Sequence, residues 1–252
     1  MTFTVAVAGK GGVGKTTFAA LAVRLLHETT KEVVLAVDAD PNANLGAKLG
    51  TAPGKTLGSI REDMLARGEE EPPKGISKQE YLDYQIRLAL KEGEGFDLLT
   101  MGRQEGPGCY CYVNNMLRMI VDSISEKYKY IVIDNEAGME HLSRRTTRRS
   151  DVLFVLCDSS KSSQEAAVRI SRLADEMKLA VTRKALVFNR LEPGNADAIP
   201  SKADGFHAVY GVRKSGTMLV KAEETESLMQ TPRTDPAFAD IAKAVESERR
   251  AK

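Results

Sequence analysis

A glycine-rich run with two lysines constrains this chain more than any other feature of its sequence. It reads Gly9-Lys10-Gly11-Gly12-Val13-Gly14-Lys15-Thr16 and directly follows the apolar stretch Val5-Ala6-Val7-Ala8. Glycines lack a Cβ, so backbone N–H groups can turn inward around phosphate oxygens, and a helix that starts at the loop adds the positive end of its dipole. The order strand, loop, helix is the context in which G-x-x-x-x-G-K-[ST] binds phosphate. We therefore expect a phosphate-binding loop here.

Three side chains of this loop have predicted chemical roles. Lys15 would reach the β- and γ-phosphates of a nucleotide, and the Thr16 hydroxyl would ligate Mg²⁺. Lys10 adds a second cation. The residues alone do not decide whether its side chain is simply solvated or has a function. We expect ATP to contact the loop residues Gly9, Lys10, Gly11, Gly12, Val13, Gly14, Lys15, Thr16 and Thr17.

Apolar runs of strand length alternate with helical patterns along the chain, and this alternation predicts the fold class. The runs are Val5–Ala8, Val33–Val37, Phe96–Leu99, Tyr130–Ile133, Val152–Leu156 and Ala185–Phe188, with Phe206–Val212 as a further strand. The helical patterns are Lys15–Thr29, Tyr110–Lys127, His141–Arg149, Ser162–Leu179 and Asp235–Arg249. Near-continuous apolarity is typical of strands covered on both faces, and strand–helix alternation gives right-handed crossovers. We predict an α/β fold with a doubly wound, mostly parallel sheet, as in P-loop NTPases.

The length of the chain fits one domain with an insertion. A chain of 252 residues is long enough to bury a single large core. Residues 51–95 break the alternation, with the run Glu69-Glu70-Glu71-Pro72-Pro73 and a helical stretch near Tyr81–Lys91. An insertion this long between two strands is typical of a lid, a partner surface or a mobile loop. We predict a single ATPase domain over residues 1–252 that contains this insertion.

The charge balance argues against two classes of partner. Thirty-six Lys and Arg residues oppose 35 Asp and Glu residues, and the net charge of +1 gives no general attraction to nucleic acid or anionic membrane. No apolar stretch is long enough for a transmembrane helix, and no basic leader precedes the first strand. Three cysteines, an odd number, argue against a disulfide framework. We expect a cytoplasmic protein that binds neither nucleic acid nor membrane.

Acidic residues follow two of the predicted strands. Asp38 and Asp40 follow the run Val33–Val37, and Asp134 directly follows Ile131-Val132-Ile133. The carboxyl ends of strands line the ligand crevice of an open α/β sheet. We expect Asp134 to face Mg²⁺, and the acids at 38 and 40 to support the metal shell and to orient an attacking water. A simple turn at Asp40 is the alternative.

A pair of cysteines distinguishes this chain from a generic ATPase. Gly108-Cys109-Tyr110-Cys111 places two thiols at the start of a predicted helix, whose dipole favours the thiolate form. Two thiolates give half of a tetrahedral site, and a twofold dimer would supply four sulfurs, which suit Zn²⁺, other thiophilic divalent ions or an iron–sulfur cluster. Two incidental cysteines are the alternative. Cys157 lies among apolar residues and is expected to be a small core residue.

The motifs, taken in order, resemble a known group of ATPases. Lys10-Gly11-Gly12-Val13-Gly14-Lys15-Thr16 resembles the deviant Walker A loop of the MinD/ParA and nitrogenase-iron-protein ATPases. The resemblance implies that Lys10 acts across a homodimer on the partner's nucleotide, and that Asp40 positions the attacking water while Asp38 supports the metal. It also implies that Asn189, at the end of a late strand, reads the edge of adenine.

Two segments make the resemblance more specific. The Gly-Cys-Tyr-Cys segment and the run Asp134-Asn135-Glu136-Ala137-Gly138 resemble those of the CooC-type accessory ATPases of carbon monoxide dehydrogenase. This resemblance implies that Cys109 and Cys111 bind Zn²⁺ or Ni²⁺ at a dimer interface. It implies that the chain assists nickel insertion, with apo carbon monoxide dehydrogenase or the related acetyl-CoA synthase as its partner.

Our leading hypothesis is an ATP-dependent metallochaperone whose dimerisation is gated by nucleotide, with Lys10, Lys15 and Asp40 as its catalytic residues. One alternative is an iron–sulfur reductase like the nitrogenase iron protein. That class needs a second cysteine after the acidic strand end, and residues 135–149 contain none. The other alternative is a positioning ATPase of the MinD/ParA type, which needs a membrane anchor or a basic dimer face.

Overall fold

A computed structural model describes residues 2–52, 54–66, 75–102, 122–136, 149–194, 199–223 and 226–252 of the chain. Most of the helix predicted over residues 110–127 lies outside these ranges. The helix predicted over residues 141–149 also lies outside them, except for its last residue. That residue, Arg149, is the first of a strand, so the predicted helix boundary is wrong there. Arg149 pairs with Ala180 of the neighbouring strand, and this ladder draws the residue into the sheet.

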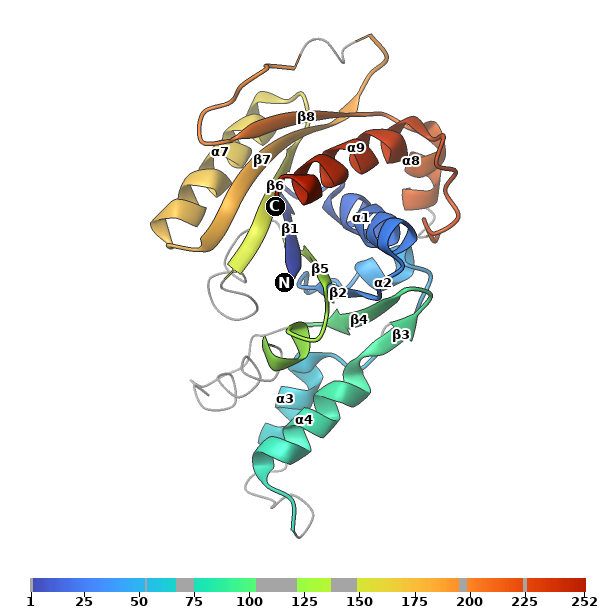
Figure 1. Ribbon diagram of the computed structural model, residues 1–252, viewed down its shortest axis with the longest axis vertical. Helices are drawn as coiled ribbons and strands as arrows, with labels where there is room; N and C mark the ends of the chain where they lie inside the picture. The colour runs from blue at the N-terminus through green and yellow to red at the C-terminus, as the bar shows by residue number, and fades with distance from the viewer. Residues whose placement is uncertain are drawn as a thin grey trace.

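All seven predicted strands are present, and an eighth, short strand precedes Phe96 (Figure 1). The strands are β1 (Phe3–Gly9), β2 (Val34–Asp38), β3 (Lys91–Gly93), β4 (Phe96–Thr100), β5 (Tyr130–Asp134), β6 (Arg149–Cys157), β7 (Ala180–Leu191) and β8 (Ala208–Arg213). The helices are α1 (Lys15–Thr30), α2 (Leu45–Lys48), α3 (Leu57–Ala66), α4 (Lys78–Ala89), α7 (Lys161–Glu176), α8 (Gly216–Glu223) and α9 (Pro236–Arg250).

These strands form one sheet in the order β3-β4-β2-β5-β1-β6-β7-β8. Neighbouring strands are parallel throughout, except that β3 runs antiparallel to β4 at the edge. The predicted fold class, a doubly wound and mostly parallel sheet, is therefore confirmed. The chain winds outward on both sides of β1, so the crevice at the carboxyl end of β1 is where a ligand of such a fold binds.

Helices cover both faces of the sheet because alternate residues of each buried strand point to opposite sides. In β1, Val5 and Val7 belong to a core that includes apolar residues of α1 and α9. Ala6 and Ala8 belong to the opposite core, which includes α7. In Figure 1, α1 and α9 accordingly lie on one side of the sheet and α7 on the other.

The described part of the insertion at residues 51–95 supplies core rather than only surface. Leu57 and Ile60 of α3 and Leu82 and Ile86 of α4 are buried in one cluster with apolar residues of β2, β4 and β5. The helix predicted near residues 81–91 is α4, but it ends at Ala89 and the chain then enters the edge strand β3. The insertion therefore covers one half of a sheet face together with Ile124, which is buried in the same cluster.

Capping residues explain where two of the helices begin. Ser77 accepts from the backbone N–H of Glu80, and the Glu80 carboxylate accepts from the N–H of Ser77, which is a capping box at the start of α4. At α9, the Asp235 carboxylate accepts from the N–H groups of Ala237 and Phe238, and a proline occupies the first helical position. Both helices thus start at residues whose side chains satisfy the otherwise free N–H groups.

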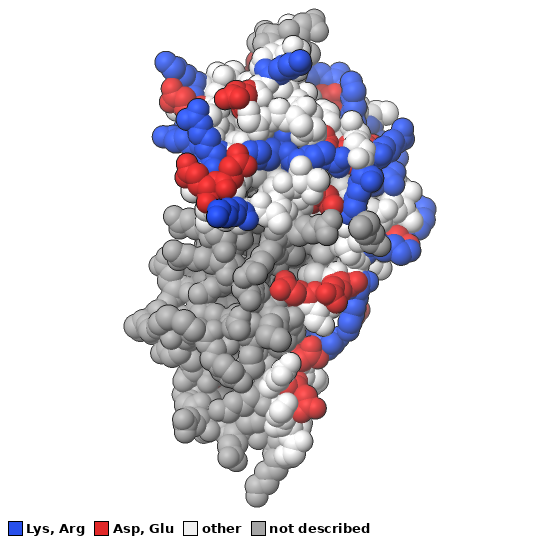
Figure 2. Space-filling view, turned by 60° about the vertical axis from the view of Figure 1, so that its left-hand side comes forward, with Lys and Arg blue, Asp and Glu red and all other residues white. Residues whose placement is uncertain are grey.

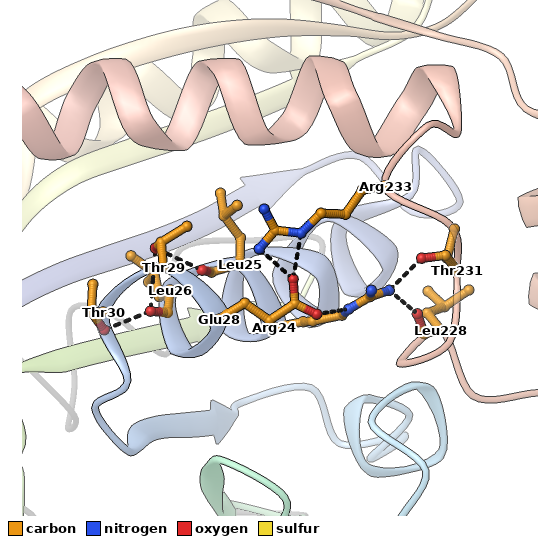
Figure 3. A network of polar contacts seen from close by, with 9 residues as sticks. All are labelled: Arg24, Leu25, Leu26, Glu28, Thr29, Thr30, Leu228, Thr231 and Arg233. Atoms are coloured by element: carbon orange, nitrogen blue, oxygen red, sulfur yellow. Dashed lines mark hydrogen bonds and ion pairs between the residues drawn. The ribbon is translucent and has the colours of Figure 1, made fainter.

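A polar network ties α1 to the segment that leads into α9 (Figure 3). Arg24 donates to Glu28 (2.6 Å) and to the carbonyl oxygens of Thr231 (2.5 Å) and Leu228 (3.4 Å). Arg233 donates to the other carboxylate oxygen of Glu28 at 2.7 Å. Burial alone would raise the pKa of Glu28, but the hydrogen bonds from the two arginines outweigh burial and lower it. This network anchors the C-terminal part of the chain to the helix that follows the phosphate loop.

The surface carries both signs of charge. On the face in Figure 2, Lys and Arg side chains lie beside Asp and Glu side chains over the described part of the molecule. Ion pairs such as that of Lys184 with Asp175 (2.6 Å) join the two signs directly. Within the described ranges, no helix is both long enough and apolar enough to cross a membrane.

Candidate functional site

The phosphate loop connects β1 to α1 at the carboxyl edge of the sheet, where the sequence predicts it. Gly14 is the N-cap of α1 and has a left-handed backbone with φ 94°, which favours glycine. No side chain caps the helix, and its first turn has no acidic residue. A Cβ placed on Gly11 or Gly12 would meet no atom within 4 Å. The loop thus leaves open space beside free N–H groups, which is the arrangement that binds phosphate.

The two lysines of the loop have different surroundings. Lys15 is buried, and its ammonium group donates to the backbone carbonyl of Lys10 at 3.3 Å. Lys10 is exposed, and its ammonium group donates to the hydroxyl of Ser162 at 3.1 Å. Ser162 lies in the first turn of α7, 152 residues away in sequence, so its contact with Lys10 had no signal in the sequence. In this single chain, Lys10 therefore contacts its own α7, and its role across a dimer stays a prediction.

Asp38 and Asp134 lie side by side at the ends of adjacent strands. β2 and β5 are neighbours, and the two aspartates are direct partners in the strand register. Asp38 is fully buried and accepts from the backbone N–H groups of Leu45 (2.8 Å) and Asp40 (3.2 Å). Burial raises the pKa of Asp38 to about 6, although these two hydrogen bonds act in the opposite direction. Two buried carboxylates are thus adjacent beside the phosphate loop.

Asp134 lacks the hydrogen bonds that Asp38 has. Its side chain is buried, and neither of its carboxylate oxygens has a hydrogen-bond partner. Burial raises the pKa of Asp134 to about 7, while the nearby Thr16 hydroxyl and Lys15 ammonium group lower it. Buried carboxylates are otherwise satisfied in proteins, so an unpartnered pair of oxygens points to a group that is bound there.

Magnesium fits these residues. The donor set consists of oxygens, from Asp134, the Thr16 hydroxyl and Asp38, which are the ligands that Mg²⁺ prefers together with phosphate and water. The unpartnered oxygens of Asp134 are those that a cation would satisfy. The structure therefore brings together the three residues that the sequence predicts for magnesium.

Asp40 lies on the loop that follows β2 and is half-buried. One of its carboxylate oxygens accepts from the backbone N–H and the side-chain amide of Asn42, both at 2.9 Å. The backbone of Asp40 in turn donates to Asp38. The residue therefore occupies a turn and is also connected to the buried acids. Its predicted role with an attacking water stays a prediction.

Asn135, which directly follows Asp134, joins the end of β5 to β1. It is fully buried, and both its backbone N–H (3.0 Å) and its side-chain amide (2.9 Å) donate to the carbonyl of Val7 in β1. Its side-chain oxygen has no hydrogen-bond partner. Asn135 thus fixes the end of β5 to the strand that carries the phosphate loop. A polar residue directly after an acidic strand end was the available signal.

A pocket adjoins the phosphate loop on the side of α8 and α9. It encloses about 430 Å³ including its open mouth. Its lining includes Gly14, Thr17, Phe18, Asn189, Val212 and Met218. The predicted nucleotide residues Thr17 and Asn189 thus border one cavity. Its apolar walls and its position after the phosphate loop suit a nucleobase.

The cysteine pair lies outside the described residues, as does Gly138 of the run that resembles the CooC-type ATPases. Within the described part of the chain, no group of three or more His, Cys, Asp and Glu side chains could hold a metal ion. Metal binding by Cys109 and Cys111 therefore stays a prediction. Cys157 is fully buried at the end of β6, as expected of a core residue, and burial raises the pKa of its thiol to about 12.

Comparisons with known proteins agree with this geometry. The family model of the AAA domain matches residues 2–187 of the chain. An uncharacterised ATP-binding protein of Methanocaldococcus jannaschii is 46% identical over 200 residues, which are 79% of this chain and 79% of that protein. The carbon monoxide dehydrogenase accessory protein CooC of Rhodospirillum rubrum is 30% identical over 214 residues, or 80% of each protein.

The fold is similar to that of solved ATPases. The cell division ATPase MinD of Pyrococcus furiosus superimposes with a TM-score of 0.70 and 21% sequence identity. The match covers 100% of both chains. The sheet, the phosphate loop and the helices on both faces therefore belong to an architecture that is already known.

Proposed function

This chain belongs to the AAA-domain family of MinD/ParA-like ATP-binding proteins, and on that premise we propose that it is an ATP-dependent metallochaperone. The ATPase would assist nickel insertion into carbon monoxide dehydrogenase or the related acetyl-CoA synthase. Nucleotide would gate its dimerisation, and Cys109 and Cys111 would bind the metal. The similarity to the CooC accessory protein and the Cys-Tyr-Cys segment support the choice of client.

The observation that carries the ATPase part of the proposal is the buried, unpartnered carboxylate of Asp134 beside Lys15 and Thr16. A site for a nucleoside triphosphate and its cation needs an ammonium group, a hydroxyl and carboxylate oxygens beside the free N–H groups of a helix. All of these groups lie together here. At such a site, magnesium supplies neutralisation of the charge on the terminal phosphates. Thr16, Asp134 and Asp38 are the residues that would hold it.

The other residues of the site would divide the remaining work. Lys15 would bind the β- and γ-phosphates from within the chain, and Lys10 would leave Ser162 to stabilise the phosphates bound by the partner subunit. Asp40 would accept a hydrogen bond from the attacking water and so orient it toward the terminal phosphate. Hydrolysis by this water would give ADP and inorganic phosphate, and release of the phosphate would remove the negative charge that holds the closed dimer together, so that the cysteine site reopens.

Metal binding by the cysteine pair is tested by elemental analysis. We expect a Cys109→Ala/Cys111→Ala variant to lose its nickel or zinc while its ATP affinity stays unchanged, because the two thiols belong neither to the phosphate loop nor to the acidic strand ends. Cys157→Ala is the matched control, since it removes one thiol from the core and should keep the metal. Full retention of metal by the double variant would contradict the proposal.

A second experiment separates this function from the two alternatives. After anaerobic reconstitution with iron and sulfide, a stable and redox-active brown chromophore would instead support an iron–sulfur reductase. Co-sedimentation with liposomes or DNA in the presence of ATP would support a positioning ATPase. The metallochaperone predicts neither result, and it predicts ATP-dependent nickel transfer to an apoenzyme.

A further inference from the structure

Asn189 has an orientation that the protein itself fixes. It lies near the carboxyl end of β7, where the register with β8 shifts between Phe188 and Leu191. The next residue, Arg190, has a left-handed backbone with φ 60°. The side-chain oxygen of Asn189 accepts from the backbone N–H of Arg190 at 2.9 Å. Such an irregularity at a strand end re-aims a side chain, and here the amide nitrogen turns toward the phosphate loop.

The amide nitrogen of Asn189 is bound inside the loop. It donates to the carbonyl of Val13 at 2.7 Å. A Cβ on the following residue, Gly14, would lie 2.5 Å from this nitrogen, so the amide occupies space that only a glycine leaves free. Val13 is almost fully buried and Asn189 is half-buried, so this hydrogen bond is partly buried. The phosphate loop and the end of β7 therefore fit each other closely.

This contact has a consequence for the other side of the peptide group. The bond between Val13 and Gly14 is trans, and in a trans peptide the C=O and N–H groups point in opposite directions. A carbonyl of Val13 that is fixed toward Asn189 therefore fixes the N–H of Gly14 away from it. That N–H belongs to the loop whose N–H groups surround the phosphates in this motif.

We propose that Asn189 is a positioning residue for phosphate binding, which holds the Val13–Gly14 peptide in the orientation that the triphosphate needs. One N–H and the oxygen of its amide are engaged within the protein, and apolar residues such as Met218 and Leu219 form other walls of the adjoining pocket. This inference rests on the proposed function only through nucleotide binding and is independent of the metal and its client.

The proposal is tested by comparing ligands with and without a base. Dissociation constants would be measured by calorimetry, in the presence of Mg²⁺, for ATP, GTP and inorganic tripolyphosphate. We expect Asn189→Asp and Asn189→Ala to weaken all three ligands by a similar factor, on the order of tenfold, because each removes the donor to Val13. Asn189→Asp is nearly isosteric, and its unfolding midpoint would show that the chain is folded.

Leu219→Ala is the matched control. Leu219 is half-buried and lines the same pocket, and its apolar side chain has no atom that could form a hydrogen bond with the loop. We expect this variant to bind ATP and GTP more weakly and to bind tripolyphosphate with unchanged affinity. If the Asn189 variants weaken the binding of all three ligands and Leu219→Ala weakens only that of ATP and GTP, then Asn189 acts on the phosphates and Leu219 on the base.

Two results would overturn the proposal. One is weaker binding of ATP alone by the Asn189 variants, with tripolyphosphate unaffected, since that pattern means that the amide reads the base. The other is unchanged affinity for all three ligands. A wild-type chain that binds no triphosphate would overturn this inference and the proposed ATPase together. Equal losses would support the inference whether or not the cysteines bind metal.

Discussion

Asp134 is a residue that is placed for ligand binding and that lowers the stability of the ligand-free fold. Its oxygens are buried without partners, next to a second buried carboxylate. In the nucleotide-free chain, the nearby Thr16 hydroxyl and Lys15 ammonium group compensate the desolvation of this group only in part, because its pKa stays raised to about 7. A buried unsatisfied polar group costs about 1–3 kcal/mol. Bound cation and nucleotide would remove that cost, so the ligand and the fold are thermodynamically linked.

Replacing Asp134 by Asn should therefore separate stability from activity. We expect Asp134→Asn to raise the free energy of unfolding of the nucleotide-free protein by about 1–3 kcal/mol, because a neutral amide is less costly to bury. For a chain of this size, that is an increase in melting temperature of about 2–4 °C per kcal/mol. The same change should reduce magnesium-dependent ATP hydrolysis at least about a hundredfold. Thermal denaturation in EDTA and a phosphate-release assay check the two effects.

Asp38→Asn is the control for that experiment. Asp38 accepts from two backbone N–H groups, and an amide at this position could not accept from both without reorienting. We expect this variant to melt at a lower temperature than the wild type. If both substitutions lowered the melting temperature equally, the view of Asp134 as an uncompensated buried charge would be wrong.

At the scale of secondary structure, α1 connects the phosphate loop to the C-terminal part of the chain. Glu28 binds Arg24 within the helix and Arg233 beyond it (Figure 3). Its pKa lies below the ordinary value of 4.5. A lowered pKa in the folded state contributes stability that is fully present above the ordinary value and is lost as the pH falls through the lowered one.

We therefore expect a pH-dependent effect of Glu28→Gln. At neutral pH the variant should lose about 0.5–1 kcal/mol of unfolding free energy, since the pair is partly exposed. In acid the wild-type carboxylate is protonated and becomes neutral, like the amide of the variant. The difference in unfolding free energy between the two proteins should therefore shrink toward zero. Urea denaturation at several pH values measures this difference in unfolding free energy. Glu165→Gln on the exposed side of α7 should change nothing, and a difference that stayed constant with pH would contradict this account.

The elements differ in how far the sequence predicts them. β1, β2, β5 and β6 could be predicted because continuous apolar runs have few alternatives to a strand covered on both faces. The packing of α3 and α4 against the sheet could not, because the spacing of apolar residues does not say which face of which strand they will cover. The edge strand β3 is a short, exposed run of polar residues and Gly93, so it forms through its pairing with β4.

The candidate site shows the same division. The loop residues and the strand-end acids Asp38 and Asp134 could be predicted because their spacing within one segment carries the chemistry. The contact of Lys10 with Ser162 and that of Asn189 with Val13 join residues more than 150 positions apart. The second of these depends on a register shift in β7, for which no local pattern exists.

At the scale of the whole molecule, the central prediction is a dimer that forms around ATP. We expect Asp40→Ala to bind ATP and to lose hydrolysis, since the carboxylate would orient the attacking water and its other described hydrogen bonds come from Asn42 in the same turn. With Mg²⁺ and ATP, light scattering should then show a persistent species of twice the 27.5 kDa of one chain. The wild type should return to single chains as its ATP is consumed.

Lys10→Ala provides the contrast. Its ammonium group is exposed, donates a hydrogen bond to Ser162 and interacts electrostatically with Asp158, so its removal should leave the fold intact. We expect this variant to bind ATP as a single chain and to hydrolyse it slowly. A Lys10→Ala protein that dimerised as well as Asp40→Ala would show that the lysine does not act between subunits.

The burial of Cys157 has a practical consequence. Its thiol is inaccessible and reluctant to ionise, whereas alkylating reagents such as iodoacetamide attack exposed thiolates. Any carbamidomethyl group that mass spectrometry counts in the folded protein would therefore lie on Cys109 or Cys111 and not on Cys157. If such adducts form in the metal-free protein, their loss on addition of nickel and ATP would report that the sulfur ligands of the unaltered wild-type chain are occupied.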